Sequence, residues 1–359
     1  MAFSFGFSGD DIDTGDEISP SQQPQAPPPP APSAFPIPGK PQLPPTLEPL
    51  ASLISRLPSK IAFSCLDVAL DDGKTVMQIP RRELWDVRVQ LMAEDEGGDG
   101  PEGLGQHDVK SGVYEGGFKS WESSVDLVKV LAATDDLYGP EGKPVRVIEL
   151  GCGTALPSLA LFQWSIQSQG KSGPRPFSFI AADYNPTVLQ LVTLPNFILA
   201  WALAVRSSTP LVKGAFTDDG ELELTPELLE AFHTTLSESN INLSFLSGAW
   251  SSQFVDLTYE AAPTSAASPT TLILGSETIY SPFALQAFTE TIFSILERER
   301  GVPESAAVAL VAAKRLYFGV GGSLDDFIEN ATARGGAITQ LREETEGVRR
   351  GVVRCALGS

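Results

Sequence analysis

A glycine turn and two acidic residues are the part of this chain best placed to do chemistry. Residues 145–150 alternate in β-forming character, carry Glu149, and lead directly into Gly151-Cys152-Gly153. Glycine lets a backbone bend sharply and approach a ligand closely, because it has no Cβ. A second apolar run, residues 177–182, ends in Asp183, and an acid at a strand end can hydrogen-bond both hydroxyls of a ribose. The turn and Asp183 together predict a nucleoside site.

The same residues discriminate between two nucleoside ligands. A dinucleotide fingerprint needs a small residue three positions after the second glycine, where this chain has Leu156. Glu149 would repel a diphosphate but would attract the ammonium of a methionine moiety. S-adenosylmethionine is therefore favoured, with a tight turn that binds no ligand as the alternative. A dehydrogenase is disfavoured further, because no histidine or lysine motif for a hydride partner is found.

Charge and cysteine content limit the possible partners. The 25 basic and 45 acidic residues give a formal charge of −20, which repels nucleic acid phosphates and favours a basic partner. Cys65, Cys152 and Cys355 lie far apart, as expected for a reduced intracellular protein. With only His107 and His233 available, a metal site is not expected. Cys152 is expected to fill the ligand turn and not to act as a nucleophile.

No membrane span or leader is expected. The longest apolar run, residues 192–205, contains Pro195 and Asn196 and falls short of the roughly 20 residues that a bilayer requires. It is predicted to be a buried helix. The N-terminal residues lack the basic residues and the cleavage site of a signal peptide. We therefore expect an intracellular protein.

The chain is expected to divide into three parts. Proline dominates residues 20–49, so residues 1–55 should be a disordered tether. Residues 56–118 should form a cap of short strands and a flexible loop, and residues 119–359 the catalytic domain. Alternating strand and helix patterns in this domain predict an α/β fold with a doubly wound, mostly parallel sheet. The later strands are expected at residues 242–247, 271–276, 305–313, 336–341 and 349–357, with helices at 225–237 and 283–299.

Five segments in order between residues 114 and 322 resemble the histidine protein methyltransferases. They read YEGGFKSWESSVDLV, ELGCGTALPSL, DYNPTVLQLVTLPN, GSETIYSP and KRLYFGVGG. This resemblance implies the Rossmann-like, seven-stranded sheet of class I methyltransferases, in which the last two strands pair antiparallel at one edge. It also implies S-adenosylmethionine as the cofactor.

The resemblance extends the expected cofactor site beyond the glycine turn. The helix after Ser120, its possible cap, could hold the methionine carboxylate with its first amides and with the hydroxyls of Ser123 and Ser124. Ala249 stands where relatives often carry an acid, so the adenine should meet backbone groups or a neighbour, with Trp250 as a wall or as a core residue. The expected cofactor residues are Trp121, Glu122, Ser123, Ser124, Glu149, Gly151, Cys152, Gly153, Asp183, Tyr184, Asn185, Gly248, Ala249, Trp250 and Ser276.

The acceptor site is implied by two of the same segments. Glu277-Thr278-Ile279-Tyr280 looks like the acid-x-x-tyrosine motif that places the acceptor in related protein methyltransferases, so Glu277 and Tyr280 are the expected catalytic residues. Our hypothesis is that Glu277 accepts the N–H of an acceptor imidazole while Tyr280 and Tyr317 frame its ring. The expected acceptor-binding residues are Lys314, Arg315, Tyr317 and Gly319.

The resemblance implies methylation of a histidine in a large-subunit ribosomal protein, a basic partner for this acidic chain. Two alternatives remain: a lysine methyltransferase of the same fold, and an assembly factor that binds S-adenosylmethionine without catalysis. Direct contact with nucleic acid or with a membrane is not expected. A monomer in the cytoplasm and nucleus is the expectation.

Overall fold

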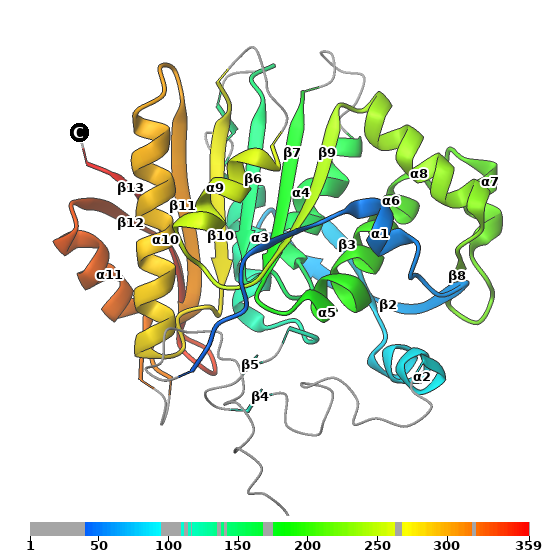
Figure 1. Cartoon of the computed structure of the whole chain (residues 1–359), viewed down its shortest axis with the longest axis horizontal. Coiled ribbons are helices and arrows are strands. Elements are labelled where there is room, and N and C mark those ends of the chain that lie inside the picture. Colours follow the sequence, from blue (N-terminus) through cyan, green and yellow to red (C-terminus); the bar gives the residue numbers. More distant parts are fainter. Residues whose placement is uncertain are drawn as a thin grey trace, which may run out of the picture. The chain divides into compact units, whose positions relative to one another are not determined.

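The computed structural model describes residues 40–94, 109–110, 114–115, 117–134, 138–139, 142–167, 175–262, 268–317 and 321–358 (Figure 1). The expected disorder of residues 1–39 and the expected flexible loop at residues 97–105 lie outside the described residues.

An eight-stranded sheet forms the centre of the fold. Its order is β1-β9-β7-β6-β10-β11-β13-β12. The strands β9, β7, β6, β10 and β11 are parallel, whereas β13 runs antiparallel between β11 and β12. The predicted doubly wound, mostly parallel α/β class is confirmed. The bounds are β1 Thr46–Glu48, β6 Val145–Leu150, β7 Phe177–Asp183, β9 Ile241–Ser247, β10 Thr270–Ser276, β11 Ala306–Lys314, β12 Gly336–Glu344 and β13 Arg350–Leu357.

Helices cover both faces of this sheet because alternate strand residues face opposite layers. In β6, Val147 joins the core beneath α3, α4 and α6, whereas Ile148 joins the core beneath α9, α10 and α11. Both side chains are fully buried, so the parallel strands are apolar on both faces. The bounds of these helices are α3 Glu122–Ala133, α4 Leu156–Gln167, α6 Leu194–Val205, α9 Ser252–Glu260, α10 Pro282–Arg300 and α11 Leu324–Ala333.

The apolar run at residues 192–205 forms a buried helix, as predicted, but the helical segment is longer than expected. Helix α5 (Pro186–Val188), a π-helical turn η2 (Leu189–Thr193) and α6 follow one another without a break. Together they span 20 residues of mean hydropathy 1.9, long and apolar enough to cross a membrane, and 83% of the most apolar stretch is buried inside the protein. Pro195 has no backbone N–H to donate. The π-helical turn, with its wider hydrogen-bond spacing, ends two residues before this proline.

The N-terminal part is more ordered than its composition indicated. Residues 46–54, expected to lie in a disordered tether, form β1 and α1 (Leu50–Ile54), and β1 adds the eighth strand next to β9. The predicted short strands are present as β2 (Lys60–Ala69) and β3 (Val76–Arg82), and α2 (Leu84–Glu94) follows them. The remaining elements are β4 Val109–Lys110, β5 Tyr114–Glu115, α7 Pro210–Ala215, β8 Glu221–Glu223 and α8 Pro226–Glu238.

This N-terminal part is interlocked with the catalytic part. Strand β2 pairs antiparallel with both β3 and β8, and β8 lies between α7 and α8 in the sequence. The side chain of Arg82 is buried and donates to the carbonyl of Leu191 in η2 at 2.9 Å. The extension is therefore anchored on the helix that begins at the carboxyl end of β7.

Candidate active site

The predicted site residues gather at the carboxyl ends of the parallel strands. The glycine turn follows β6, Asp183 ends β7, Gly248 follows β9, Glu277 follows β10 and Lys314 ends β11. In Figure 1 this is the lower edge of the sheet, where β7 leads into α5. Carboxyl ends of open α/β sheets are where such folds bind ligands.

The turn after β6 requires both of its glycines. Gly151 and Gly153 have φ of +64° and +50°, a left-handed backbone that other residues adopt only under strain. A Cβ on Gly153 would lie 3.0 Å from the carbonyl oxygen of Gly117, and one on Gly151 would lie 2.7 Å from the side chain of Thr278. The segment before α3 and the segment after β10 thus approach the turn too closely for any larger residue.

Asp183 links this turn to the end of β7. Its side-chain oxygens accept from the backbone N–H of Gly153 and from that of Asn185, both at 3.0 Å. Asn185 in turn caps α5 by accepting from Thr187 N–H at 2.9 Å. The structure therefore brings Asp183 to the glycine turn, as the strand order implies.

Glu149 lies beneath the turn. Its side chain is buried and accepts from the backbone N–H of Ser158, in the first turn of α4, at 3.0 Å. Burial raises the pKa of this carboxyl to about 7, although hydrogen bonds from Ser158 oppose the shift. The contact predicted for Glu149 was the ammonium of the methionine moiety. The structure instead places its carboxylate under α4, where it fixes the start of that helix.

Residues to which the sequence analysis gave no role hold the carbonyl side of the turn. Thr193, in η2, donates its hydroxyl to the carbonyl of Gly153 at 2.7 Å, and Asn196 donates to that of Thr154 at 3.1 Å. Asn196 also accepts from the backbone N–H of Arg82 at 2.7 Å. Their only sequence signal is their place in the segment DYNPTVLQLVTLPN. The N-terminal extension is thereby coupled to the cofactor turn.

Cys152 has the environment of a structural thiol. It is buried, and desolvation raises the pKa of its thiol well above the usual range, with further contributions from Asp183 and Glu149. A reactive cysteine needs the opposite shift, because the thiolate is the nucleophile. The structure thus gives no support to nucleophilic chemistry at this position.

The start of α3 differs from the prediction. Trp121 occupies the N-cap position without a side-chain cap, while the hydroxyl of Ser120 bonds to that of Thr154 at 2.9 Å. Ser124 donates to the carbonyl of Trp121 at 2.6 Å, and Ser123 donates to Glu277. Both serine hydroxyls expected to hold the methionine carboxylate are thus committed within the protein. The backbone amide of Ser124 also donates to the carbonyl of Trp121, at 3.0 Å, so the earlier amides of this first turn, next to the exposed Glu122, are the groups that could attract an anion.

Glu277 is the centre of a buried polar cluster. It has φ of +57°, a strained conformation for a residue with a Cβ, and strained residues concentrate at functional sites. Its carboxylate accepts from the hydroxyls of Ser123 and Tyr317, the latter at 2.6 Å, and lies 4.0 Å from Nζ of Lys314. Burial raises the pKa of Glu277, while these hydrogen bonds and Lys314 act against the rise.

Aromatic rings surround the cation of this cluster. Nζ of Lys314 lies 5.1 Å from the ring centre of Trp121 and 5.7 Å from that of Tyr317. Burial, with the nearby carboxylate of Glu277, raises the pKa of Tyr317, so its hydroxyl remains a hydrogen-bond donor. Tyr280 is half-buried and contributes to the same shift. The structure thus brings together the residues predicted to frame the acceptor.

One predicted acceptor residue of the described ranges does not join the cluster. Arg315 forms ion pairs with Asp325 and with Glu343, the latter at 3.4 Å, and donates to Gln340 at 2.8 Å. Its guanidinium is therefore committed to α11 and β12 and does not clamp a peptide at Glu277. Gly319 lies outside the described residues.

The end of β9 provides an aromatic surface near the turn. Trp250 is half-buried, and its ring centre lies 5.6 Å from that of Phe288. It is also 3.8 Å from the position that a Cβ of Gly151 would take. Ala249 is buried, and Ser276, at the end of β10, is half-buried. Trp250 therefore packs on the core and also faces the turn, which is compatible with both predicted roles, that of a core residue and that of a wall of the adenine site.

Comparison with known proteins identifies the family. No protein-family model matches the chain. Histidine protein methyltransferase 1 of Saccharomyces cerevisiae is 37% identical over 262 residues, which cover 69% of this chain and 67% of that protein. Its namesake in Schizosaccharomyces pombe is 32% identical over 314 residues, covering 85% of this chain and 83% of that protein. The chain belongs to the histidine protein methyltransferase family. It is therefore a protein methyltransferase that uses S-adenosylmethionine.

Solved structures resemble the methyltransferase only distantly. The human methyltransferase 10 domain containing protein is 11% identical with a TM-score of 0.37, and the alignment covers 67% of this chain and 85% of that one. The rRNA methyltransferase aviRa from Streptomyces viridochromogenes is 14% identical with a TM-score of 0.35, covering 67% and 86%. The family assignment depends on the sequence relatives alone.

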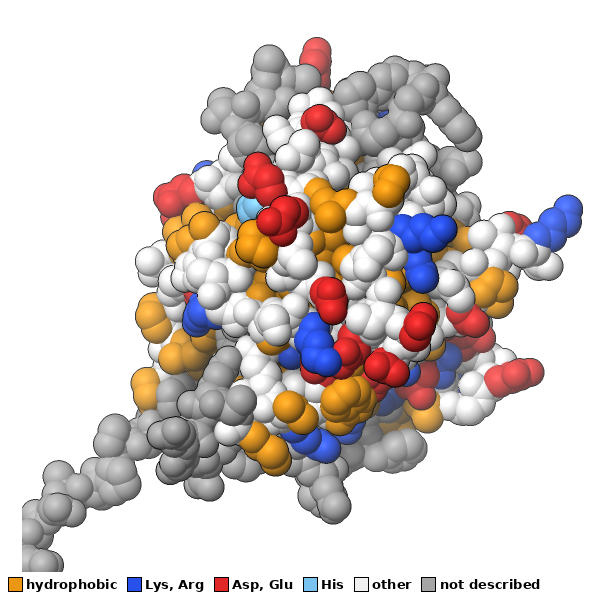
Figure 2. All heavy atoms as spheres, turned by 90° about the vertical axis from the view of Figure 1, so that its right-hand side faces the viewer, with side chains coloured by type: hydrophobic (Ala, Val, Ile, Leu, Met, Phe, Trp, Pro, Cys, Tyr) orange, Lys and Arg blue, Asp and Glu red, His pale blue; other side chains and the backbone are white. Residues whose placement is uncertain are grey.

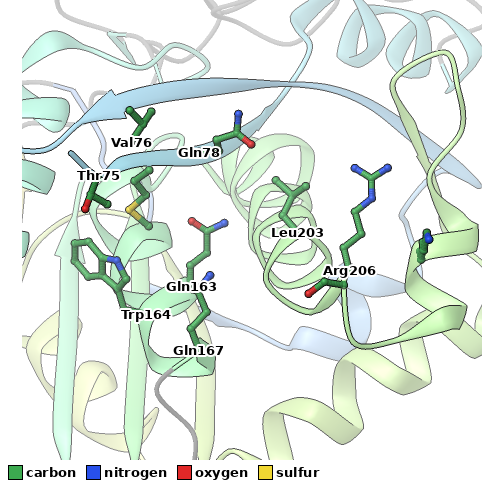
Figure 3. Close-up of a pocket in the computed structure, with 11 residues that line it drawn as sticks. Thr75, Val76, Gln78, Gln163, Trp164, Gln167, Leu203 and Arg206 are labelled. Atoms are coloured by element: carbon green, nitrogen blue, oxygen red, sulfur yellow. The ribbon is translucent and has the colours of Figure 1, made fainter.

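A large cavity in the methyltransferase lies away from this edge. It measures about 780 Å³ and opens between β3 and the last turns of α4 and α6 (Figure 3). None of the predicted site residues lines it. The lining residues are Thr75, Val76, Met77, Gln78, Gln163, Trp164, Gln167, Leu203, Arg206, Ser207 and Lys213. Since α4 begins at the glycine turn and ends here, this cavity is distinct from the cofactor site.

Within the described ranges, no cluster of three or more histidine, cysteine, aspartate or glutamate side chains is arranged to hold a metal ion. His107 lies outside these ranges.

We predict that Thr193→Val weakens cofactor binding. The variant keeps the shape of the side chain but leaves the Gly153 carbonyl without its donor, which should cost about 1–2 kcal/mol of unfolding free energy. Because the freed carbonyl is part of the turn, affinity for S-adenosylhomocysteine should fall about tenfold, as measured by calorimetry. Thr289→Val is the matched control, since Thr289 is buried in α10 and donates to Leu285 at 2.7 Å. Equal affinities of the two variants would contradict this role.

The raised pKa of Glu149 predicts a pH-dependent stability. Because the folded pKa of about 7 exceeds the unfolded value near 4.5, the contribution is fully present below pH 4.5 and is lost as pH rises through 7. This loss amounts to roughly 3 kcal/mol. Glu149→Gln retains an acceptor for Ser158 but does not titrate. The free energy of unfolding is measured in urea at pH 5 and at pH 8. Relative to the parent, the variant should be more stable at pH 8 than it is at pH 5. A difference between variant and parent that is the same at both pH values would refute the prediction.

Proposed function

We propose that this methyltransferase transfers the methyl group of S-adenosylmethionine to an imidazole nitrogen of a histidine in a basic protein, namely a large-subunit ribosomal protein. Family membership supports histidine as the acceptor, because both yeast relatives are named for it. The observation that carries the proposal is the buried Glu277 cluster, which lies at the same sheet edge as the glycine turn. The cytoplasm and the nucleus are the compartments we propose.

The residues at this edge fit S-adenosylmethionine. Asp183 lies beside the glycine turn at the end of β7, where a carboxylate can accept from ribose hydroxyls. The first turn of α3 carries no side-chain cap that would compete with the methionine carboxylate. Trp250 offers a flat apolar surface next to the turn. When bound there, the cofactor supplies an activated methyl group on a sulfonium.

Transfer to imidazole requires alignment more than strong base catalysis. An imidazole with a pKa of about 6.5 is mostly neutral at pH 7, whereas a lysine at about 10.4 must first lose a proton. Alignment of the two reactants can contribute roughly 7–11 kcal/mol. The chain therefore needs to fix one tautomer of the ring so that the unprotonated nitrogen faces the methyl group.

Glu277 is suited to fix this tautomer. In our proposal its carboxylate accepts the N–H of the acceptor ring. The opposite nitrogen would then form a bond to the methyl carbon as the bond between that carbon and the sulfonium sulfur breaks, which leaves the sulfur neutral. The ring then carries a positive charge, which the buried carboxylate stabilises. Because burial raises its pKa, Glu277 is also a better proton acceptor than an exposed glutamate. Tyr317 and Ser123 hold the carboxylate in place by donating to it.

Charge supports a basic protein as the partner. The formal charge of −20 attracts a basic protein and repels nucleic acid phosphates. On the face shown in Figure 2, lysine and arginine side chains are scattered among acidic and apolar ones and form no continuous basic stripe. These features favour recognition of a protein surface, and we propose that the enzyme acts as a monomer without direct contact to nucleic acid.

One labelling experiment tests the proposal. The purified protein is incubated with cofactor carrying a radiolabelled methyl group and with extract from cells that lack the enzyme, and the labelled band is hydrolysed. We expect methylhistidine in a ribosomal protein. Methyllysine would favour the lysine alternative, and absence of label despite cofactor binding would favour the non-catalytic assembly factor.

We predict that Glu277→Gln lowers kcat at least about 100-fold, the range seen when an electrostatic stabiliser is removed. The amide keeps the size of the side chain but cannot carry the charge that balances the imidazolium. Cofactor affinity should stay within about twofold, because the change affects the acceptor side. Glu297→Gln is the matched control, since Glu297 is exposed near the end of α10, away from this edge. Full turnover of Glu277→Gln would exclude the proposed role.

A further inference from the structure

An N-terminal strap, residues 40–48, crosses the carboxyl ends of β7 and β9 (Figure 1, dark blue). Its last residues form β1, which pairs antiparallel with β9 so that Thr46 faces Ser247. Further along, Leu43 donates its N–H to the hydroxyl of Tyr184 and accepts from the N–H of Ala249, both at 3.0 Å. The strap is therefore bonded to residues that directly follow both strands.

Gly248 allows this close approach. Its φ is +94°, and a Cβ at this position would lie 2.3 Å from the carbonyl oxygen of Pro44 and 2.8 Å from Cα of Pro45. Since backbone atoms cannot yield to such a contact, no other residue fits here without displacing the strap. Pro45 is buried, and Ser247 donates to the carboxylate of Glu48 at 2.6 Å. The strap is thus packed into the fold.

The strand order places the base of the cofactor next to this strap. The glycine turn follows β6, Asp183 ends the neighbouring β7, and β9 is the next strand outward. In the proposed site the methionine part lies at the glycine turn, on the β6 side of Asp183, so a base attached to a ribose at Asp183 lies on the other side, towards β9. At that point Ala249 has no polar side chain, and its backbone N–H is already donated to Leu43. The nearest surface for the base is therefore formed by Trp250 and by the strap.

We infer that Leu43 and Pro44 form a wall of the adenine subsite, an inference that rests on the proposed function. Tyr184 then acts as a positioning residue, because its hydroxyl accepts from the strap. The strap stays in place when the cofactor binds. It encloses the base at the position of Ala249, whose side chain offers no polar group. This explains the glycine at 248 and the ordered segment within a proline-rich region.

A reversible cross-link tests whether the strap stays in place. Thr46→Cys and Ser247→Cys introduce thiols at facing positions of an antiparallel pair, whose Cβ separation of about 4.5–5.5 Å lies near the range that a disulfide bridges. Cys65→Ser removes the native cysteine that is not buried. We expect the oxidised and reduced proteins to bind S-adenosylhomocysteine within about twofold of each other. Affinity that falls about tenfold or more on oxidation would show that the strap must leave, and would overturn the inference.

Two further substitutions test whether the strap contributes to binding. Tyr184→Phe and Leu43→Pro each remove the hydrogen bond between these residues, one from each side. Each should weaken S-adenosylhomocysteine binding about fivefold. The double variant should bind as tightly as the single variant with the lower affinity, because both substitutions remove the same hydrogen bond. Unchanged affinity in both single variants would refute the inference. Their unfolding transitions serve as controls for folding.

The parent protein separates this inference from the proposed function. If the parent failed to bind S-adenosylhomocysteine, the proposed function would fail and the inference with it. If the parent bound and the variants bound equally well, the proposed function would stand and only the inference on the strap would be lost.

Discussion

Hydrogen bonding of buried backbone groups around the glycine turn is the constraint on which this active site depends. A left-handed turn exposes amide and carbonyl groups that no regular element satisfies, and leaving such groups unpaired inside a protein costs about 1–3 kcal/mol each. Asp183 satisfies the Gly153 amide, Thr193 its carbonyl, and Asn196 the carbonyl of Thr154. Because these side chains come from β7, η2 and α6, the turn keeps its shape only when the helices are packed.

The sequence predicts those features of the site that depend on local chemistry. The glycines at 151 and 153 predict a sharp turn, because only glycine adopts this left-handed backbone freely. Asp183 ends an apolar run that is recognisable in the sequence as a buried strand. Periodicity likewise predicts the mostly parallel sheet. Spacing places Glu149 next to the turn but cannot show that its side chain accepts from Ser158 at the start of α4.

Partners that are distant in sequence could not be predicted. Glu48 meets Ser247, and β2 pairs with β8 across about 160 residues, contacts that no local pattern reveals. Proline content also misled the assignment of residues 46–54, because Pro44, Pro45 and Pro49 lie beside β1 and α1 and not within them. The importance of Glu277 was implied by resemblance, but the donor Ser123 belongs to a different element and became visible only in three dimensions.

The two buried acids at this sheet edge differ in their electrostatic surroundings. Burial raises the pKa of both Glu149 and Glu277, because a buried carboxylate loses the water that stabilises its charge. Glu149 lies beneath α4 and accepts from the backbone N–H of Ser158, so its contacts are made within the fold. Glu277 accepts from two hydroxyls and lies 4.0 Å from Nζ of Lys314, and these contacts offset part of the cost of its burial. A further positive charge next to Glu277, such as that of an imidazolium, would lower the energy of this carboxylate, whereas an anion would raise it.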